Sequence, residues 1–331
     1  MPIVLGKGKN MKTGFLFPGY GNQFSGMAKD LYDNFRVVQE LFEEAAVCLD
    51  TNFVKLCFAS SESNLGQLPN AYVSLFLVSI SITKVLEDHM ITPSVVAGYD
   101  IGEYGALASV NGITVPDALY LLKKYGVTYE QFLKEKPLEA LRIQGVSAFD
   151  IAHMCSHATN GAQFAALSVV EPNDNYIVGG TLTSLNIIKQ ILKTKKIKTY
   201  KDVDVGGGVH SSFMDEILKT MKMYLEKVDF KDTTVPFVAG VTGQALSYGD
   251  ALRAALMQQI HATLRIDRII ESFAFCDSIV IIGPGKMLLQ MCKNAYPDKA
   301  IFEVTNLATL QEVLAFNDKL LVTTGDDTDD K

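Results

Sequence analysis

The sequence predicts an α/β fold in which one large domain carries an inserted, ferredoxin-like α+β subdomain. Short apolar strands that pass at once into glycine turns and helices, as at 13–17, are typical of the large domain. Between 141 and 204 the pattern changes to two helices among short strands, which indicates a separate small unit. With 331 residues, of which 48% are hydrophobic, the chain is long enough for both.

The large domain is predicted from alternating strands and helices. The strand 13–17 ends in the turn Pro18-Gly19-Tyr20-Gly21, and a second strand at 95–97 leads into another glycine turn. Helical spacing of apolar residues predicts five helices, at 35–49, 71–86, 103–110, 116–132 and 212–227. The helix at 71–86 is apolar nearly all round, so we expect it in the core. Two short strands are predicted at 235–238 and 278–282.

The small subdomain is predicted to contain helices at 148–157 and 184–192 and strands at 164–170, 175–178 and 198–205. We therefore expect residues 12–140 and 205–315 to form the large domain and 141–204 the ferredoxin-like subdomain. Residues 316–331 are expected to be a tail. Its acidic end, 323–331, lacks a core-forming pattern and is expected to be disordered.

The composition narrows the class of protein. A net charge of -7 argues against a nucleic-acid binder. Five cysteines without CxxC spacing predict neither a disulfide framework nor a metal site. No apolar tract reaches 18 residues and no signal-peptide pattern is found, so we expect no membrane span and a cytoplasmic protein. We also expect the protein to be a monomer.

One local cluster of lysines departs from the acidic average. It is either the solvated face of a helix or a docking patch for a small acidic partner. Its main members are Lys189, Lys193, Lys195 and Lys196.

The run Gly98-Tyr99-Asp100-Ile101-Gly102 after the apolar strand has the layout of a nucleophile elbow, G-x-S-x-G. Such a turn exposes its central side chain at a helix N-terminus. The central residue here is Asp100, and a carboxylate at neutral pH has no proton to give. The usual Ser-His form of acyl transfer is therefore not expected.

Five motifs follow one another in a specific order: Phe-Pro-Gly-x-Gly-x-Gln (17–23), Gly-x-x-x-Gly-Glu-Tyr (98–104), His-Ser-x-x-Met (210–214), Val-Thr-Gly (241–243) and Gly-Pro-Gly-Lys-x-Leu (283–288). From about residue 12 to 310 the chain resembles malonyl-CoA:acyl carrier protein transacylases and the acyltransferase domains of polyketide synthases. The resemblance implies an acyltransferase fold with an α/β-hydrolase-like large domain. It also implies no cofactor, because the acyl carrier protein that would be the partner supplies the phosphopantetheine arm.

The resemblance assigns the family's nucleophile to Asp100 and its catalytic histidine to His210. The histidine that usually precedes the nucleophile is Tyr99 here, and Ile101 follows it in the expected pocket. The family's glutamine in the first glycine turn, whose backbone helps form the oxyanion hole, is Tyr20.

Three further pocket positions depart from the family. The arginine that clamps the malonyl carboxylate falls on Tyr125 when counted without gaps from the elbow. The asparagine whose carbonyl helps orient the histidine falls on Gly240. The segment before the histidine, including Gly208 and Val209, is small and would leave room for a larger acyl chain.

These departures predict a remodelled active site in which Asp100 and His210 act as an acid-base pair. Dehydration of a carrier-bound β-hydroxyacyl chain is preferred. The second possible reaction is hydrolysis, in which the pair activates water or Asp100 attacks the thioester. Without the arginine clamp, a malonyl transferase is not expected. The alternative is a catalytically inactive homologue that serves as a carrier-protein-binding scaffold. In either case we expect a trans-acting component of polyketide or fatty-acid assembly.

Overall fold

The computed structural model describes residues 11–204, 206 and 209–325, with side chains as far as residue 319. A six-stranded sheet has the order β11-β10-β1-β2-β7-β8, in which only the β7-β8 pair is antiparallel. Its strands are β1 (Thr13–Phe17), β2 (Val95–Gly98), β7 (Phe237–Val238), β8 (Ala245–Leu246), β10 (Ser278–Ile282) and β11 (Ala300–Val304).

The register of the two central strands determines where a site can form. Phe17 at the end of β1 pairs with Gly98 at the end of β2. Because the two strands are parallel, the turns that follow them leave the sheet at the same edge. In an α/β sheet this edge is the usual place for a ligand or catalytic site.

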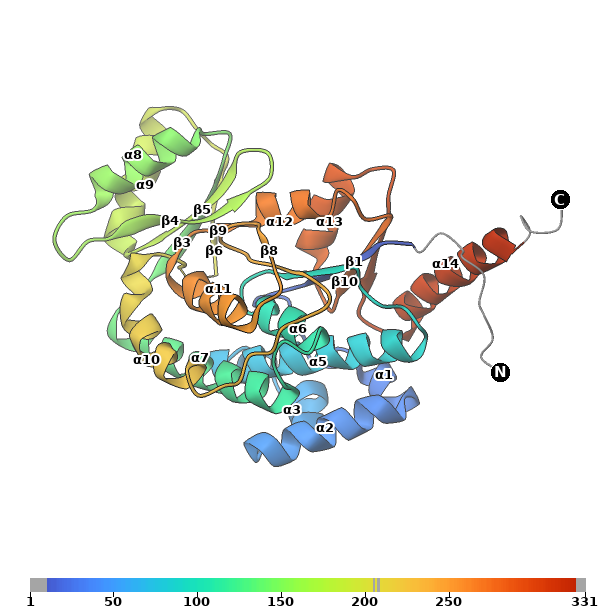
Figure 1. Cartoon of the computed structure of the whole chain (residues 1–331). Helices are drawn as coiled ribbons and strands as arrows, with labels where there is room; N and C mark the ends of the chain where they lie inside the picture. The colour runs from blue at the N-terminus through green and yellow to red at the C-terminus, as the bar shows by residue number, and fades with distance from the viewer. Residues whose placement is uncertain (1–10, 205, 207–208, 326–331) are drawn as a thin grey trace.

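Helices cover both faces of the large sheet (Figure 1). Thr114 caps α7 by accepting a hydrogen bond from the Asp117 backbone, and Pro116 lies in the first turn of that helix. The helices of this part are α1 (Lys29–Asn34), α2 (Arg36–Leu49), α3 (Phe53–Ala59), α4 (Glu62–Leu65), α5 (Leu68–Asp88), α6 (Gly102–Ser109), α7 (Val115–Glu135), α10 (Asp215–Leu225), α11 (Gly249–His261), α12 (Ile266–Ser272), α13 (Lys286–Ala295) and α14 (Leu307–Gly325).

Helix α5 is the central helix of the core. Among the described residues it alone is long and apolar enough to cross a membrane by length and composition, but 83% of its most apolar 18-residue window is buried inside the molecule. It packs against α2, α6 and α7. This burial is what a core helix of a globular domain requires.

The second sheet has five strands in the order β6-β3-β5-β4-β9. Its chain order is β3 (Glu139–Gln144), α8 (Ala148–Ala158), β4 (Ala165–Glu171), β5 (Asn175–Gly180), α9 (Leu182–Thr194) and β6 (Tyr200–Val203). This is the βαββαβ order of a ferredoxin-like unit, and Figure 1 shows α8 and α9 together on one face of the sheet. The predicted fold class is therefore confirmed.

The small sheet differs from expectation in two strands. The sequence analysis missed β3, which only three residues separate from the end of α7, so that its short alternating pattern is hard to tell from the end of the helix. The edge strand β9 (Leu264–Arg265) pairs in parallel with β4, although it lies far along the chain from 141–204. The expected domain boundaries themselves remain a prediction.

The expected tail is helical as far as residue 325, and its boundary remains a prediction. Residues 316–325 continue α14, which extends away from the body of the molecule on the side opposite the small sheet (Figure 1). Apolar residues continue at helical spacing through this stretch, and Leu310 and Val313 at its base are buried. Residues 326–331, which include most of the acidic end, lie outside the described residues.

Candidate active site

Asp100 lies at the tight turn between β2 and α6. Its φ of 55° is in the left-handed region, as is common at a strained elbow. Gly98 makes the turn possible, since a Cβ on Gly98 would collide with the backbone of Gly102 and Glu103. The turn buries the Asp100 side chain, which is 1% exposed.

Both carboxylate oxygens of Asp100 accept hydrogen bonds. Oδ2 accepts from the Tyr20 backbone N–H at 3.4 Å, and Oδ1 accepts from Nε2 of Gln259 at 3.3 Å. Burial raises the pKa of Asp100 well above its ordinary value of 3.8, and hydrogen bonds from Ile101, Tyr20 and Gln259 oppose that rise. Loss of water is therefore the dominant influence on this carboxyl group.

His210 faces the same carboxyl group. Its Nε2 lies 3.6 Å from Asp100 Oδ1, and its Nδ1 lies 2.7 Å from the backbone carbonyl oxygen of Gln259. Because a carbonyl oxygen can only accept, Nδ1 carries a hydrogen and Nε2 faces Asp100. Both side chains are 1% exposed, and their 3.6 Å separation is slightly longer than a hydrogen bond, so a small approach of the two groups would let one proton pass between carboxyl and imidazole.

Gln259 is a site residue that the sequence analysis missed. It lies on α11 in a segment for which no helix was predicted, and its only sequence signal is its place in the run Met-Gln-Gln-Ile. Its contacts to Asp100 and His210 cross 159 and 49 residues of chain, a distance that local pattern cannot bridge. Its side chain is fully buried.

Gly240, which occupies the position of the family's asparagine, uses both of its backbone polar groups in other contacts. Its carbonyl oxygen accepts from the backbone N–H of Arg265 at 2.7 Å, and its own N–H donates to Oε1 of Glu103 at 2.6 Å. The carbonyl oxygen that lies within hydrogen-bond distance of His210 Nδ1 belongs to Gln259, at 2.7 Å.

Tyrosines form a continuous aromatic wall next to the elbow, which we call the tyrosine wall: Tyr20, Tyr72, Tyr125 and Tyr129. Successive ring centroids are 6.0, 5.5 and 6.2 Å apart. The Tyr20 hydroxyl donates to the Gly66 carbonyl at 3.2 Å and the Tyr72 hydroxyl to the Gly206 carbonyl at 2.6 Å. Tyr125 is fully buried on α7.

The remaining predicted pocket residues lie around the elbow with different neighbours. Ile101 is buried in the same core cluster as the tyrosine wall. Tyr99 packs against a separate cluster together with Val203 and Val241. Val209 is buried and sits so close to Gly179 of β5 that a Cβ there would collide with it. Gly208 lies outside the described residues.

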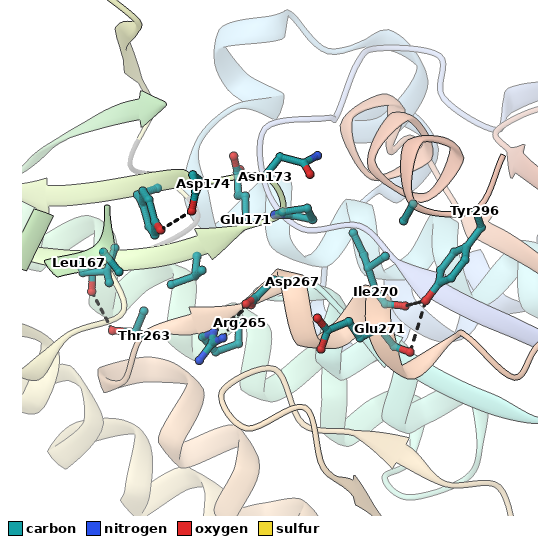
Figure 2. Close-up of a pocket in the computed structure, with 15 residues that line it drawn as sticks. Leu167, Glu171, Asn173, Asp174, Thr263, Arg265, Asp267, Ile270, Glu271 and Tyr296 are labelled. Atoms are coloured by element: carbon teal, nitrogen blue, oxygen red, sulfur yellow. Dashed lines mark hydrogen bonds and ion pairs between the residues drawn. The ribbon is translucent and has the colours of Figure 1, made fainter. Parts of the chain in front are cut away.

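A cavity of about 820 Å³ lies elsewhere, where β4 and β9 face α12 and α13 (Figure 2). Its charges are largely paired: Arg265 holds Asp267 through two hydrogen bonds, and Glu171 accepts from Arg142. In Figure 2 the Tyr296 hydroxyl points to the carbonyls of Ile270 and Glu271. None of the candidate site residues lines this cavity, so it is separate from the Asp100 and His210 pair.

The four lysines of the candidate docking patch lie in the second half of α9 and in the turn after it. Lys189 pairs with Asp202 at 2.6 Å and Lys195 with Asp150 at 3.0 Å. Lys193 and Lys196 are exposed. Within the described residues no group of three or more histidine, cysteine, aspartate or glutamate side chains could hold a metal ion.

Comparison with known proteins decides the family. The sequence model of the family described as acyl transferase domain matches residues 14–309 of this chain. This chain belongs to the acyl transferase family. A curated relative, the malonyl CoA-acyl carrier protein transacylase of Bacillus subtilis (strain 168), is 27% identical over 285 residues, which cover 86% of this chain and 90% of the relative. The protein of the same name from Staphylococcus aureus (strain MRSA252) is 24% identical, with 93% and 99% covered.

Solved structures agree on the fold. The acyl carrier protein S-malonyltransferase of Vibrio cholerae gives a TM-score of 0.85 at 23% identity, with 91% of this chain and 99% of that chain covered. A malonyl-transacylase in complex with a type II PKS acyl-carrier protein gives 0.86 at 23% identity, with 92% and 99% covered.

These relatives correct the function expected from the sequence. The exclusion of a malonyl transferase is wrong, because the curated relatives that cover most of this chain are named malonyl CoA-acyl carrier protein transacylases. Dehydration, hydrolysis and an inert scaffold have no counterpart in those names. The exclusion depended on one missing arginine, and the site contains other buried hydrogen-bond donors, notably the hydroxyls of Tyr104 and Tyr125.

Proposed function

We propose that this protein is a transacylase that moves an acyl group, malonyl in its named relatives, between coenzyme A and an acyl carrier protein. The observation that carries the proposal is the Asp100 and His210 pair, with Nε2 3.6 Å from Oδ1, at the elbow of an acyl transferase fold. The Asp100 carboxylate is the nucleophile in place of an alcohol.

The first half of the reaction uses the ion-pair form of Asp100 and His210. Asp100 Oδ1 attacks the thioester carbonyl carbon of acyl-CoA, and the carbon–sulfur bond breaks. The thiolate of coenzyme A takes the proton from His210 Nε2 and leaves as a thiol. Asp100 then carries the acyl group as a mixed anhydride, and His210 is neutral.

The second half reverses these steps with a new thiol. His210 Nε2 takes the proton of the phosphopantetheine thiol, the thiolate attacks the acyl carbon, and the carbon–oxygen bond to Asp100 breaks. Negative charge returns to the carboxylate, whose oxygens face the Tyr20 N–H and the Gln259 amide. These donors stabilise Asp100 as a leaving group.

The partner of this reaction is an acyl carrier protein, whose phosphopantetheine arm makes a separate cofactor unnecessary. A carrier protein of acidic surface could dock on the exposed Lys193 and Lys196, next to the paired Lys189 and Lys195. The setting we propose is a carrier-protein pathway, polyketide or fatty-acid assembly, in the cytoplasm.

Mass spectrometry of the carrier protein tests the proposal. With malonyl-CoA and a carrier protein that bears its phosphopantetheine arm, the protein should transfer malonyl to the arm. Asp100→Ala and His210→Ala should each abolish the transfer, whereas Asp267→Ala, in the separate cavity, serves as the matched control and should leave it unchanged. Failure of the native protein to transfer malonyl or any other acyl group from coenzyme A would refute the proposal.

A further inference from the structure

The backbone of His210 is in a strained conformation. Its φ of 39° lies in the left-handed region, which a residue with a Cβ adopts at a cost in free energy. Such a conformation persists only where contacts with the surrounding structure hold it. Only Ser211 separates His210 from the short 3₁₀ helix η1 (Ser212–Met214), and α10 follows directly. The contacts that hold η1 and α10 in place therefore affect the direction of the imidazole.

The imidazole is oriented by a carbonyl group at the end of another helix. Nδ1 of His210 lies 2.7 Å from the backbone carbonyl oxygen of Gln259, in the last turn of α11. Carbonyls of a last turn have no N–H of their own helix to pair with, and helix ends fray. Helix α11 packs against η1 and α10 (Figure 1). The alignment of His210 with Asp100 thus depends on how the end of α11 is held against the start of α10.

An ion pair at the surface joins these two helix ends. His261 is the last residue of α11, and its Nδ1 lies 2.9 Å from Oδ1 of Asp215, the first residue of α10. Because a carboxylate oxygen can only accept, His261 Nδ1 donates this hydrogen bond. Asp215 lies at a helix N-terminus and His261 at a helix C-terminus, the ends that favour a carboxylate and a protonated imidazole.

The ion pair and the buried contact link the same two segments of chain. His261 comes two residues after Gln259, and Asp215 comes five residues after His210. The side chains of His261 and Asp215 are 34% and 62% exposed, whereas that of His210 is 1% exposed. The surface pair can therefore act on the reaction only through the helix ends that it joins.

We propose that Asp215 and His261 are positioning residues, whose ion pair holds the end of α11 against the start of α10 and so keeps the Gln259 carbonyl aligned with the His210 imidazole. The proposal rests on the proposed function, in which His210 moves the proton. The pair can favour the aligned arrangement by no more than its own energy. For an exposed ion pair this limit is a factor of about five.

Steady-state kinetics of malonyl transfer test the proposal. His261→Ala should lower kcat about threefold to fivefold and leave KM for malonyl-CoA and for the carrier protein unchanged, because the pair acts on proton transfer and not on substrate binding. Asp215→Ala should have the same effect. The double variant should be no slower than either single variant, since each removes the same contact.

A conservative variant and a neighbouring ion pair are the matched controls. His261→Asn should have the native kcat, because the asparagine amide nitrogen can take the place of Nδ1 and donate to Asp215. Glu216 is the next residue on α10 and carries the same charge, but it pairs with Lys136, just after α7. Glu216→Ala should therefore also have the native kcat. A kcat of His261→Asn or of Glu216→Ala as low as that of His261→Ala would overturn the proposal.

The hydrogen on His210 Nδ1 gives a measurement that needs no turnover. Because this N–H is buried, its proton NMR signal should be observable, and its loss in His210→Asn assigns it. Exchange of this hydrogen with solvent should be about threefold to fivefold faster in His261→Ala than in the native protein and unchanged in Glu216→Ala. Equal exchange rates in His261→Ala and the native protein would count against the ion pair as a positioning device.

The two proposals fail separately. If malonyl transfer is never observed but the exchange rates differ as expected, the transacylase proposal fails and the positioning role of the ion pair stands. If malonyl is transferred but kcat and the exchange rate in His261→Ala are those of the native protein, the positioning role fails and the transacylase stands.

Discussion

Gln259 contacts the catalytic pair through two different atoms. Its side-chain Nε2 donates to Asp100 at 3.3 Å, and its backbone carbonyl oxygen lies 2.7 Å from His210 Nδ1. A Gln259→Met substitution removes the first contact and keeps the second, because methionine has a similar length and the backbone is unchanged. The unpaired Oε1 also disappears.

The size of the effect follows from this geometry. A hydrogen bond to a charged group contributes about 1.5–3 kcal/mol. At 3.3 Å the bond is long, so the lower limit applies, and about 1.5 kcal/mol corresponds to about one pH unit. Because the Gln259 amide lowers the pKa of Asp100, its loss raises that pKa. The carboxylate is the nucleophile, so the acidic limb of activity should move up by about one pH unit.

The assay is the pH dependence of kcat for malonyl transfer to the carrier protein. At pH values on the acidic limb, kcat of Gln259→Met should be about tenfold lower than kcat of the native protein, and at high pH the two kcat values should converge. Gln258→Met, one residue away and exposed, is the matched control and should have the native profile. An unchanged acidic limb in Gln259→Met would show that the amide does not act on the nucleophile.

Three further predictions concern the elbow and the docking patch. The pKa of Asp100 in the folded chain is above its ordinary value of 3.8, so its contribution to stability is greatest below pH 3.8 and is lost as the pH rises through the folded pKa. Asp100→Asn should therefore raise the unfolding temperature near neutral pH, by about 2 °C or more, and leave it unchanged below pH 3.8; a lower temperature near neutrality would contradict this. In Gly19→Ala the new Cβ would lie 2.5 Å from the Tyr99 carbonyl oxygen and 3.0 Å from Asp100 Oδ2. The resulting displacement of the Tyr20 N–H should reduce kcat for malonyl transfer about 100-fold, and a kcat close to that of the native protein would contradict this prediction. Reversing the charge of Lys193 and Lys196 should raise KM for the carrier protein about threefold at low salt without changing KM for malonyl-CoA; equal KM values would exclude this face as the docking patch.

Most of the fold could be predicted because its signals are local. Local sequence patterns predicted a strand at 95–97, a tight turn between the glycines on both sides of Asp100 and a helix at 116–132. The structure has β2, the elbow and α7 at these places. The parallel pairing of β1 with β2 then brings Tyr20 to Asp100. A strand, a turn and a helix in sequence are enough to expect this arrangement.

The rest depends on contacts between distant parts of the chain. Gln259 reaches Asp100 from 159 residues away, and β9 joins the small sheet from outside the segment 141–204. The unpaired hydroxyl of Tyr125 is likewise visible only after α7 is packed, because a tyrosine in a sequence does not reveal whether its oxygen has a partner. The exclusion of a malonyl transferase, inferred from one missing arginine, was wrong, as the names of the curated relatives show.

Trapping of the covalent intermediate tests the role of Asp100 directly. Hydroxylamine added during turnover with malonyl-CoA should convert the anhydride on Asp100 to the aspartyl hydroxamate, which peptide mass spectrometry locates. The modification should require malonyl-CoA and should be absent in His210→Ala. Transfer of malonyl to the carrier protein without any hydroxamate at Asp100, and with Asp100→Ala as fast as the native protein, would contradict the proposed nucleophile.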